Sequence, residues 1–482
     1  MEGVKTGPKL KILTEDQIDQ IHEASLSILQ RTGVRYDSPM AVEKLVKYGA
    51  VLKHDSKDVV TFSRSLIEDS LKKIPRWRTY FARNPKSNIR YDGEHLFAGS
   101  LGGNPSILDL DTGQPRASVL EDVEKTARVM DALPNCHTIA NMVVATEVPP
   151  EIQAIKTVEA LMKNTSKCVS GYALNKETID VMVDMWSVVA GGHEELRKRP
   201  MLAMFGSPSS PLTFDRSVCE VMVRSAEHGV PVDIVPCPMA GGTAPVTLSG
   251  GLAQQNAEML AGIMLVQTVD HRLPTGYSGR LSILDLRTGA NLWGGAEVAL
   301  ASAATVQIAH RYHIGADVYG VTSDAPSWGM QMGLERMLVA LLPAMAGADS
   351  LSGIGGAWGT NSSYEMLVID NEIYGDVFRA VEGIQVDHGR LALDVIDKVG
   401  NMGTFLSQKH TMEYLKKGEI RSSPLWDKRG AERAWKEGIR PLEEKAREEA
   451  RRLLKEHEPE RLDKDIDKEL SRVVKEGSKS LM

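Results

Sequence analysis

Residues 317–356 read DVYGVTSDAPSWGMQMGLERMLVALLPAMAGADSLSGIGG, and this stretch decides the fold class. A short run of small and β-branched residues, 317–323, precedes an amphipathic helical pattern over 327–347, and a second short run follows at 350–356. Two neighbouring parallel strands require a crossover of about helix length. The order therefore predicts one strand–helix–strand unit of a parallel sheet.

The same unit recurs through the middle of the chain. Strand-like runs are found at 96–100, 138–144, 168–173, 201–206, 232–237, 274–279, 317–323 and 350–356. Helical patterns follow them at 119–132, 150–164, 176–191, 215–229, 248–269, 294–313, 327–347 and 363–385. Eight such units predict an α/β fold, a (β/α)8 TIM barrel, within residues 91–410. A doubly wound open sheet is the alternative, but no GxGxxG opens the first helix, which favours the barrel.

Helical patterns also flank the barrel. In an N-terminal extension, residues 1–90, Thr14 is placed to cap a helix that Gly33 ends, with shorter helices expected at 39–49 and 63–73 and a strand at 59–62. Residues 411–482 form a charged tail in which opposite charges recur at i,i+4 spacing. That pattern is typical of solvated helices, and a docking segment for another protein is the alternative.

Composition and charge narrow the function classes. Apolar residues make up 42% and charged residues 25% of the chain, with no run of membrane-spanning length and no signal-peptide pattern, so no membrane association is expected. The net charge of −7 argues against nucleic acid as a partner and agrees with a cationic substrate. The four cysteines lie far apart and predict no disulfide framework, which fits a reducing cytoplasm.

The C-terminal ends of the predicted strands indicate where a site would form, because barrel active sites lie there. Aromatic residues gather at or near these ends, although only 5% of the chain is aromatic: Phe97, Tyr172, Phe205, Tyr277 and Trp358. An aromatic-walled pocket suits a quaternary ammonium group through cation–π contact. Core packing is the alternative for each of these residues, and it is least favoured for Trp358, whose glycine-rich surroundings favour the pocket.

Few charged residues occupy the strand ends. Arg280 has the geometry to bind a substrate carboxylate through two oxygens, and a structural salt bridge is equally consistent with its position. Asp324 is placed either to cap a helix or to face a cation, and Glu147 follows the second strand. Gly355 and Gly356 belong to a glycine loop, 353–359, that lacks the P-loop lysine, so backbone packing against a small ligand is favoured over phosphate binding.

Two common kinds of catalysis find no support in the sequence. His310 and His313 share a predicted helix face, but no carboxylate or cysteine accompanies them at ligand spacing, so no metal site is expected. No GxSxG is present, and no histidine stands at a predicted strand end to activate a hydroxyl nucleophile.

Several strings resemble the trimethylamine methyltransferase family of barrel proteins. They are 102–103 (GG), 109–113 (DLDTG) with Arg116, 323–326 (SDAP), 331–335 (QMGLE), 353–359 (GIGGAWG), 367–372 (LVIDNE), 391–400 (LALDVIDKVG), 410–411 (HT) and 426–429 (WDKR). The resemblance extends over nearly the whole chain. One departure falls at Asn401 and Met402.

The resemblance implies transfer of a methyl group from an amine to the cobalt of a separate corrinoid protein. Members that act on trimethylamine carry pyrrolysine in the loop after the eighth strand, where this chain has only ordinary residues, 356–359 (GAWG). Members without pyrrolysine resemble quaternary amine methyltransferases, whose substrates include glycine betaine, proline betaine, carnitine and butyrobetaine. The family also implies a homo-oligomer.

The expected chemistry needs little from the protein beyond positioning. A quaternary nitrogen leaves as a neutral amine, so no proton transfer is required. No DxHxxG corrinoid-binding sequence is present, so this chain should bind no cofactor of its own and a partner should supply the methylcobalamin corrinoid. We expect the substrate to be bound by Phe97, Tyr172, Phe205, Tyr277, Arg280, Asp324, Gly355, Gly356 and Trp358. A barrel lyase or aldolase, and a non-catalytic betaine-binding scaffold, are the alternative functions.

Overall fold

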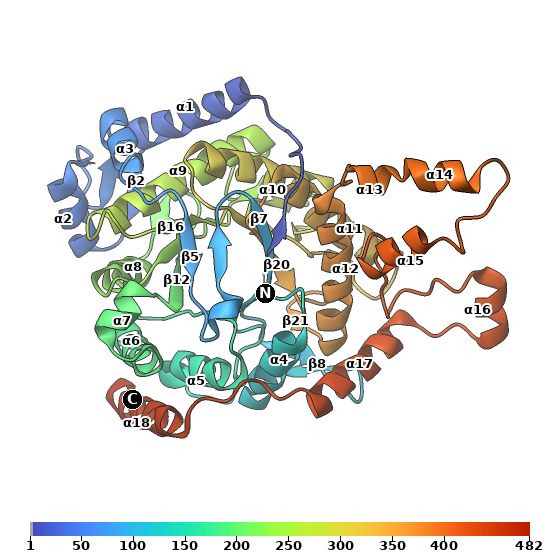
Figure 1. Ribbon diagram of the computed structural model, residues 1–482. Helices are drawn as coiled ribbons and strands as arrows, with labels where there is room; N and C mark the ends of the chain where they lie inside the picture. Colours follow the sequence, from blue (N-terminus) through green and yellow to red (C-terminus); the bar gives the residue numbers. More distant parts are fainter. Residues whose placement is uncertain (1–2) are drawn as a thin grey trace.

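A computed structural model describes residues 3–482, and its centre is a barrel of eight parallel strands (Figure 1). Going round the barrel, the strands are β16 (Thr275–Tyr277), β14 (Val232–Ile234), β12 (Leu202–Gly206), β11 (Cys168–Ser170), β10 (Thr138–Ile139), β7 (His95–Ser100), β20 (Ser350–Ile354) and β19 (Asp317–Tyr319). A parallel bridge between Tyr277 and Ala316 joins the first strand to the last. All eight predicted strands and the (β/α)8 barrel are confirmed.

Eight helices surround the strands, each at its predicted place (Figure 1). They are α4 (Leu120–Ala132), α5 (Pro150–Asn164), α6 (Lys176–Ala190), α8 (Arg216–Glu227), α9 (Leu248–Gln267), α10 (Gly295–Arg311), α11 (Met330–Ala346) and α12 (Tyr364–Glu382). A short helix that was not predicted, α7 (His193–Lys198), follows α6. Every residue of α9 from Gly251 to Gln267 is buried, which requires a second layer outside it.

The N-terminal extension supplies that second layer. α1 (Glu15–Arg31) packs along α9 and is capped by Thr14, as the sequence predicts, and Gln17 completes a capping box. α2 (Pro39–Tyr48) and α3 (Arg64–Leu71) also contact α9. The predicted strand is β4 (Val59–Thr61); it joins β2 (Val34–Tyr36), β3 (Val51–Leu52) and β13 (Thr213–Phe214) in a small sheet that the sequence did not predict.

Short strands elaborate both ends of the barrel. At the C-terminal ends of the barrel strands lie β8 (Ser106–Leu108), β9 (Pro115–Ala117) and β21 (Asn361–Ser362), and a second group of β15 (Met239–Ala240), β17 (Ser282–Leu284) and β18 (Asn291–Leu292). At the opposite end, β1 (Val4–Lys5) pairs with the first residues of β7. A hairpin of β5 (Arg78–Tyr80) and β6 (Ile89–Tyr91) precedes β7.

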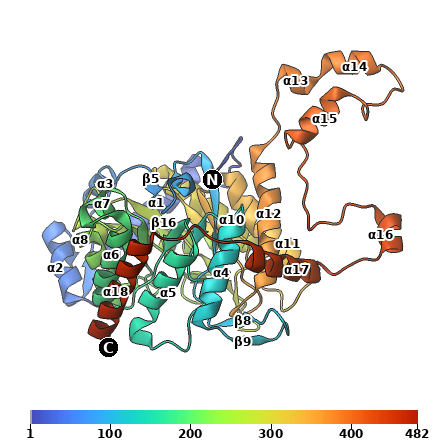
Figure 2. The ribbon, with the colours of Figure 1, turned by 60° about the horizontal axis from the view of Figure 1, so that its bottom comes forward.

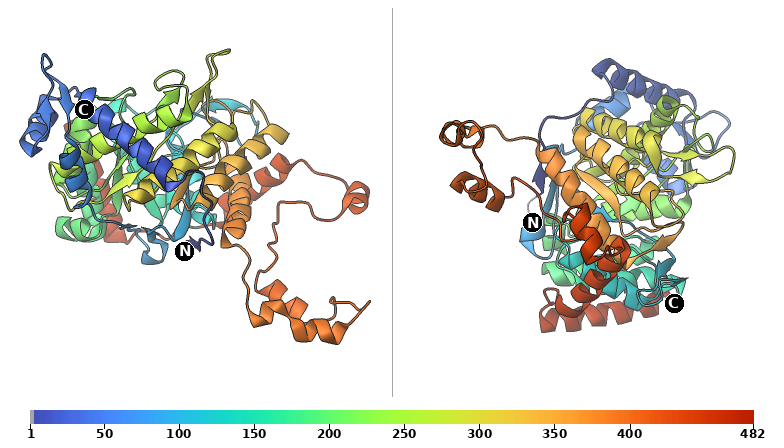
Figure 3. Two further views of the ribbon diagram at one scale, coloured as in Figure 1. Left: turned by 90° about the horizontal axis from the view of Figure 1, so that it is seen from above. Right: turned by 90° about the vertical axis from the view of Figure 1, so that its right-hand side faces the viewer.

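The last hundred residues divide into a projecting part and a docked part. α13 (His388–Leu391), α14 (Leu393–Val399), α15 (Lys409–Lys416) and α16 (Ala431–Glu437) extend away from the barrel (Figures 2 and 3). α17 (Leu442–Glu456) then returns to pack on α12 and α4, and α18 (Lys464–Leu481) packs on α5 and α6. The tail is helical as expected, but α17 and α18 are docked on the barrel through buried apolar side chains rather than solvated on all sides. None of the helices described here is both long and apolar enough to cross a bilayer.

Candidate active site

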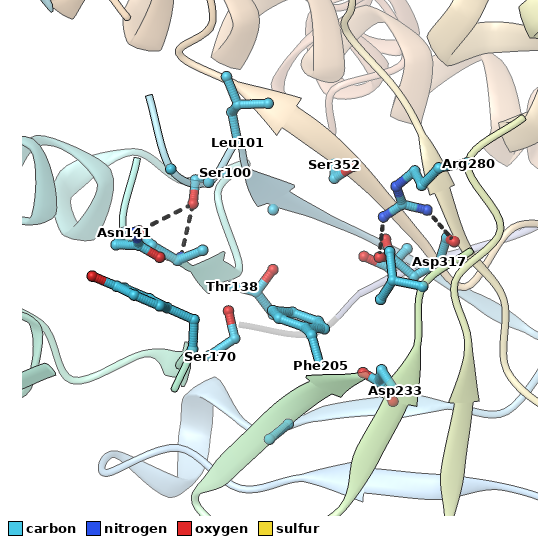
Figure 4. Close-up of a pocket in the computed structure, with 18 of the residues that line it drawn as sticks. Ser100, Leu101, Thr138, Asn141, Ser170, Phe205, Asp233, Arg280, Asp317 and Ser352 are labelled. Carbon is cyan, nitrogen blue, oxygen red and sulfur yellow. Dashed lines mark hydrogen bonds and ion pairs between the residues drawn. The ribbon is translucent and has the colours of Figure 1, made fainter. Parts of the chain in front are cut away.

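A cavity of about 570 Å³ lies inside the barrel and is lined by side chains from all eight strands or the loops that follow them (Figure 4). The lining is mainly apolar and aromatic, with serine, threonine and amide groups between; among residues 3–482 it includes three ionisable side chains other than tyrosine and cysteine. These three are Asp233, Arg280 and Asp317. A cavity of this size fits a small organic ligand.

The hairpin of β5 and β6 forms the end of the cavity nearest the starts of the strands. Tyr80 and Tyr91 line it there, together with Cys168 and Ser350, which begin their strands. The Tyr80 hydroxyl donates to the Asp233 carboxylate at 2.7 Å. Arg78, from the same hairpin, pairs with that carboxylate at 2.5 Å. Burial raises the pKa of Asp233, and Arg78 opposes that rise.

A second buried ion pair lies two strands away, because β16 separates β14 from β19 in the barrel. Arg280, which follows β16, donates to the backbone oxygen of Asp317 at 2.5 Å and pairs with the carboxylate of the same residue. Burial raises the pKa of Asp317, and Arg280 opposes it. The Arg280 guanidinium lies 5.4 Å from the centre of the Tyr319 ring. Both pairs leave the cavity wall close to electrically neutral, because each arginine faces one aspartate.

Two aromatic residues in the cavity remain free of the protein's own cations. Tyr80 and Tyr91 face Arg78, at 3.7 and 5.8 Å from its guanidinium, and Tyr319 faces Arg280. Phe205 is 37% exposed in the middle of a barrel strand whose other residues are buried. Tyr172 lines the cavity beside it and donates to Gln153 at 3.2 Å. These two rings are therefore available to a ligand.

The structure brings three of the nine expected site residues to the cavity: Tyr172, Phe205 and Arg280. Phe97 instead packs in a small core cluster with Ala82 and Ile89. Tyr277 pairs in register with Ile234, and both side chains are fully buried on the helix side of the barrel; the Tyr277 hydroxyl donates to Asn256 of α9 at 2.9 Å. In a barrel strand, alternate residues face inward, so Gly276 rather than Tyr277 is directed toward the cavity side.

The other four expected residues lie in loops above the strands but do not line the cavity. Asp324 accepts hydrogen bonds from the backbone amides of Trp293 and Gly294, at 2.7 and 2.8 Å, and so caps the start of α10 rather than the helix that follows it. Burial raises its pKa. Trp358 is half-buried and contacts the Trp328 ring edge-on, with 5.4 Å between the ring centres.

The two glycines of this group belong to a buried network. The amide of Gly355 donates to Asp370 at 2.9 Å, and the carbonyl of Gly356 accepts from Arg336. Arg336 is 1% exposed and also pairs with Asp370 at 2.8 Å. Nearby, Glu335 accepts hydrogen bonds from Ser323 and from the amide of Asp324, both at 2.7 Å. The strings at 323–326, 331–335, 353–359 and 367–372 are thus parts of one framework above the barrel.

Sequence reasoning missed most of the polar cavity lining. Asp233 and Asp317 stand within or at the start of apolar strands, 232–235 (VDIV) and 317–319 (DVY), and a charged residue in a barrel strand is a signal for an inward-facing group. The hairpin residues Tyr80 and Tyr91 lie outside the strand-and-helix pattern and carried no such signal.

The fold and the cavity define a (β/α)8-barrel protein whose site combines two neutralised ion pairs with free aromatic faces. The family model described as "Trimethylamine methyltransferase (MTTB)" matches residues 2–481 of this chain. Similar proteins include a glycine betaine methyltransferase of Desulfitobacterium hafniense (strain Y51), 32% identical over 479 residues and covering 98% of both chains. The chain therefore belongs to the trimethylamine methyltransferase family.

One further relative agrees with this assignment, and one solved structure agrees with the fold. The trimethylamine methyltransferase MttB of Desulfitobacterium hafniense (strain DSM 10664 / DCB-2) is 29% identical, with 96% of this chain and 93% of the relative covered. Among solved structures, the Methanosarcina barkeri monomethylamine methyltransferase MtmB has a TM-score of 0.54 at 13% identity, with 92% of this chain and 88% of that chain covered. The last similarity supports the fold alone.

Proposed function

We propose that this protein transfers a methyl group from a quaternary amine, with glycine betaine as the first candidate, to the Co(I) of a separate corrinoid protein. The observation that carries the proposal is the pair of aromatic rings, Phe205 and Tyr172, that no cation of the described residues faces, in a cavity whose described charged residues are paired. The similarity to a glycine betaine methyltransferase supports the choice of substrate.

The cationic end of the substrate would lie against the two free rings. A cation over an aromatic face gains roughly 0.5–2 kcal/mol, more when water is excluded. Neither buried aspartate is available as an unpaired counter-ion, because Arg78 and Arg280 already neutralise them. Recognition of the methylated nitrogen therefore depends on ring faces and shape, which suits a group that cannot donate a hydrogen bond.

The carboxylate of a betaine has one cationic partner in the cavity lining. Arg280 carries five N–H donors, and its bonds to Asp317 and to the carbonyl of Gly279 use three of them. The remaining N–H groups would donate charge-assisted hydrogen bonds to a substrate carboxylate. Arg280 and the two rings would thus hold the two ends of one zwitterion.

The reaction requires the protein to position the substrate's methyl group and requires no proton transfer. The C–N bond breaks with its electron pair staying on nitrogen, so the leaving group is a neutral tertiary amine. The corrinoid of the partner supplies the nucleophile that takes the methyl group. The chain's own residues orient the methyl carbon and limit water in the cavity, and such orientation lowers the barrier chiefly through entropy.

The surface around the cavity mouth agrees with a visiting protein. Exposed apolar side chains gather on the loops and helix starts that follow the C-terminal ends of the strands: Leu174, Val246, Leu286, Trp293, Met330 and Leu334. Exposed apolar patches mark interaction sites. A corrinoid protein docked here would bring its cofactor to the open end of the cavity.

The experiment is a methyl-transfer assay with a substrate panel. The purified protein is mixed with glycine betaine, proline betaine, carnitine, butyrobetaine or trimethylamine and a corrinoid protein reduced to Co(I), and the amine product is identified by mass spectrometry. We expect dimethylglycine from glycine betaine and no dimethylamine from trimethylamine. Binding of betaine without demethylation would support the scaffold alternative. Substrate cleavage other than at a methyl group would support a lyase.

A further inference from the structure

The cavity wall opposite Arg280 carries a group of polar side chains. Arg280 follows β16, and β10 lies four strands away from β16 in either direction round the barrel. Thr138 is the first residue of β10, Asn141 follows that strand, and Ser170 is the last residue of the neighbouring β11. Figure 4 shows these three residues, which all line the cavity, on one side of it and Arg280 on the other, with Phe205 between. They are called the polar wall below.

The side chains of the polar wall have no hydrogen-bond partner among residues 3–482. Asn141 is only 8% exposed, and Thr138 and Ser170 are half-buried although their strand neighbours Ile139 and Val169 are buried. Buried polar side chains are nearly always hydrogen-bonded in native proteins. Three free ones that meet at one side of a cavity therefore indicate a place for a polar group of the ligand, which water occupies until the ligand displaces it.

Two glycines, one in β7 and one in the loop after it, keep the polar wall open. A Cβ at Gly99, which pairs in register with Thr138, would lie 2.1 Å from the Thr138 hydroxyl oxygen. Gly103 adopts a φ of 84° and donates its amide to the backbone oxygen of Asn141 at 2.7 Å. The backbone of Asn141 is thus fixed while its side-chain amide stays free. Gly103 belongs to 102–103, one of the strings that resemble the family, and both of its glycines line the cavity.

The chemistry of the polar wall matches an uncharged group that both donates and accepts hydrogen bonds. Its two hydroxyls and one amide do both themselves, and none of them ionises near neutral pH. A carboxylate has its cationic partner across the cavity at Arg280, and a quaternary ammonium group has no hydrogen to donate. Ala140 and Ala203 line the same side and leave room for a branch of the ligand. A few placed polar groups in an apolar pocket set the orientation and specificity of binding.

We propose that the polar wall binds a hydroxyl group on the substrate's chain, so that the protein prefers a hydroxylated betaine to a betaine of equal length without the hydroxyl. This inference rests on the proposed function, which places the ammonium end at Phe205 and Tyr172 and the carboxylate at Arg280. The polar wall adds a third contact, which orients a branched chain between the other two. Glycine betaine has no such branch and leaves the polar wall to water.

Carnitine and butyrobetaine provide the test, because they share chain length and charges and differ by one hydroxyl group. In calorimetric titration the wild-type protein should bind carnitine roughly 5- to 30-fold more tightly, the effect of about one or two hydrogen bonds. Thr138→Val, Asn141→Leu and Ser170→Ala combined should lower carnitine affinity to that of butyrobetaine and leave butyrobetaine affinity unchanged. The matched control, Ser207→Ala, removes a cavity hydroxyl that donates to the carbonyl of Val235 at 2.8 Å, and it should keep the wild-type preference.

The outcomes separate this inference from the proposed function. Binding of both betaines without preference in the wild type, or a preference that persists in the triple variant, would overturn the polar wall alone. Binding of neither betaine would overturn the proposed function and the polar wall with it. Asn141→Leu by itself should reduce the preference in the same direction, which keeps the test decisive if the triple variant does not fold. Methyl transfer from butyrobetaine to the corrinoid protein should be unchanged in these variants, and a slower transfer would assign the polar wall to the corrinoid and overturn the proposal.

Discussion

Phe205 shows how a single residue reveals the site. A phenylalanine in the middle of a barrel strand is expected to be buried, yet this ring is 37% exposed because it faces the cavity. Its neighbours in β12 are buried. The three tyrosines that face Arg78 or Arg280 show that the protein already uses cation–π contacts in this barrel. A ligand cation would make the same kind of cation–π contact with the free ring of Phe205.

Replacing Phe205 with alanine should weaken glycine betaine binding roughly 2- to 30-fold, which corresponds to about 0.5–2 kcal/mol of lost cation–π energy. The melting temperature should change little, because the ring is not enclosed by the core. Calorimetric titration measures the affinity. The control ligand is 3,3-dimethylbutyrate, an isostere that keeps the carboxylate but lacks the positive charge, since its binding should be weak in the wild type and nearly the same in the variant. An equal loss of affinity for both ligands would contradict a cation–π role for Phe205.

Trp358 should behave in the opposite way. The sequence favours a pocket role for it, but the structure places its ring against Trp328 and outside the cavity lining. Trp358→Ala should therefore lower the free energy of unfolding by about 1–3 kcal/mol, less than the 3–5 kcal/mol typical of a fully buried ring. Chemical denaturation measures this change. Betaine affinity of the folded variant should equal that of the wild type, and a fall in affinity without a loss of stability would restore the pocket role.

At the scale of elements, the barrel strands and helices could be predicted because each strand–helix unit repeats one pattern of apolar and small residues. Which residues of each strand point into the barrel could not be predicted with the same success. Five of the eight strands contain only two or three residues, which is too short for an alternating pattern to show which residues point inward. Tyr277 is the clearest case, since Asp233 and Gly276 face the inside and Tyr277 packs on α9.

The hairpin of β8 and β9 contains one of the strings that resemble the family, 109–113 with Arg116, and shows its structural role. Arg116, at its end, bonds Asp109 at 2.9 Å and Asp122 of α4 at 2.6 and 2.8 Å. Asp122 also accepts from the amide of Val119 at 2.9 Å and from Tyr364 at 3.1 Å. Burial alone would raise the pKa of Asp122, but Arg116 and the Val119 amide hold it below its usual value. The hairpin is thereby fixed to the start of a barrel helix.

A pH prediction follows from Asp122. Its carboxyl has a lower pKa in the folded than in the unfolded protein, so its stabilising contribution is fully present above about pH 4 and is lost as pH falls below that value. Asp122→Asn should lower stability by about 1–3 kcal/mol at pH 7 and reduce the loss of stability on acidification. Denaturation curves between pH 3 and pH 7 measure both effects. If the variant lost as much unfolding free energy on acidification as the wild type does, other carboxylates would account for the acid sensitivity.

At the scale of the whole molecule, the two ends of the barrel carry different surfaces. The mouth combines an open cavity with a rim of exposed apolar side chains, and the opposite end carries the β5–β6 hairpin and the end of α12, from which residues 384–441 project. The sequence indicated the barrel and its helical flanks, but it could not show that α17 and α18 dock on the barrel while residues 384–441, which precede them, project from it. Both segments are rich in charge, and only tertiary contacts distinguish them.

The most direct test of the central claim is transfer of one methyl group in the presence and absence of the corrinoid. Wild-type protein is given glycine betaine, with a reduced corrinoid protein in one sample and none in the other, and the absorbance of methyl-cobalt is followed together with dimethylglycine. We predict equal amounts of methyl-cobalt and dimethylglycine in the first sample and neither in the second. Dimethylglycine formed without a corrinoid, or a corrinoid that stays unmethylated while betaine is consumed, would contradict it.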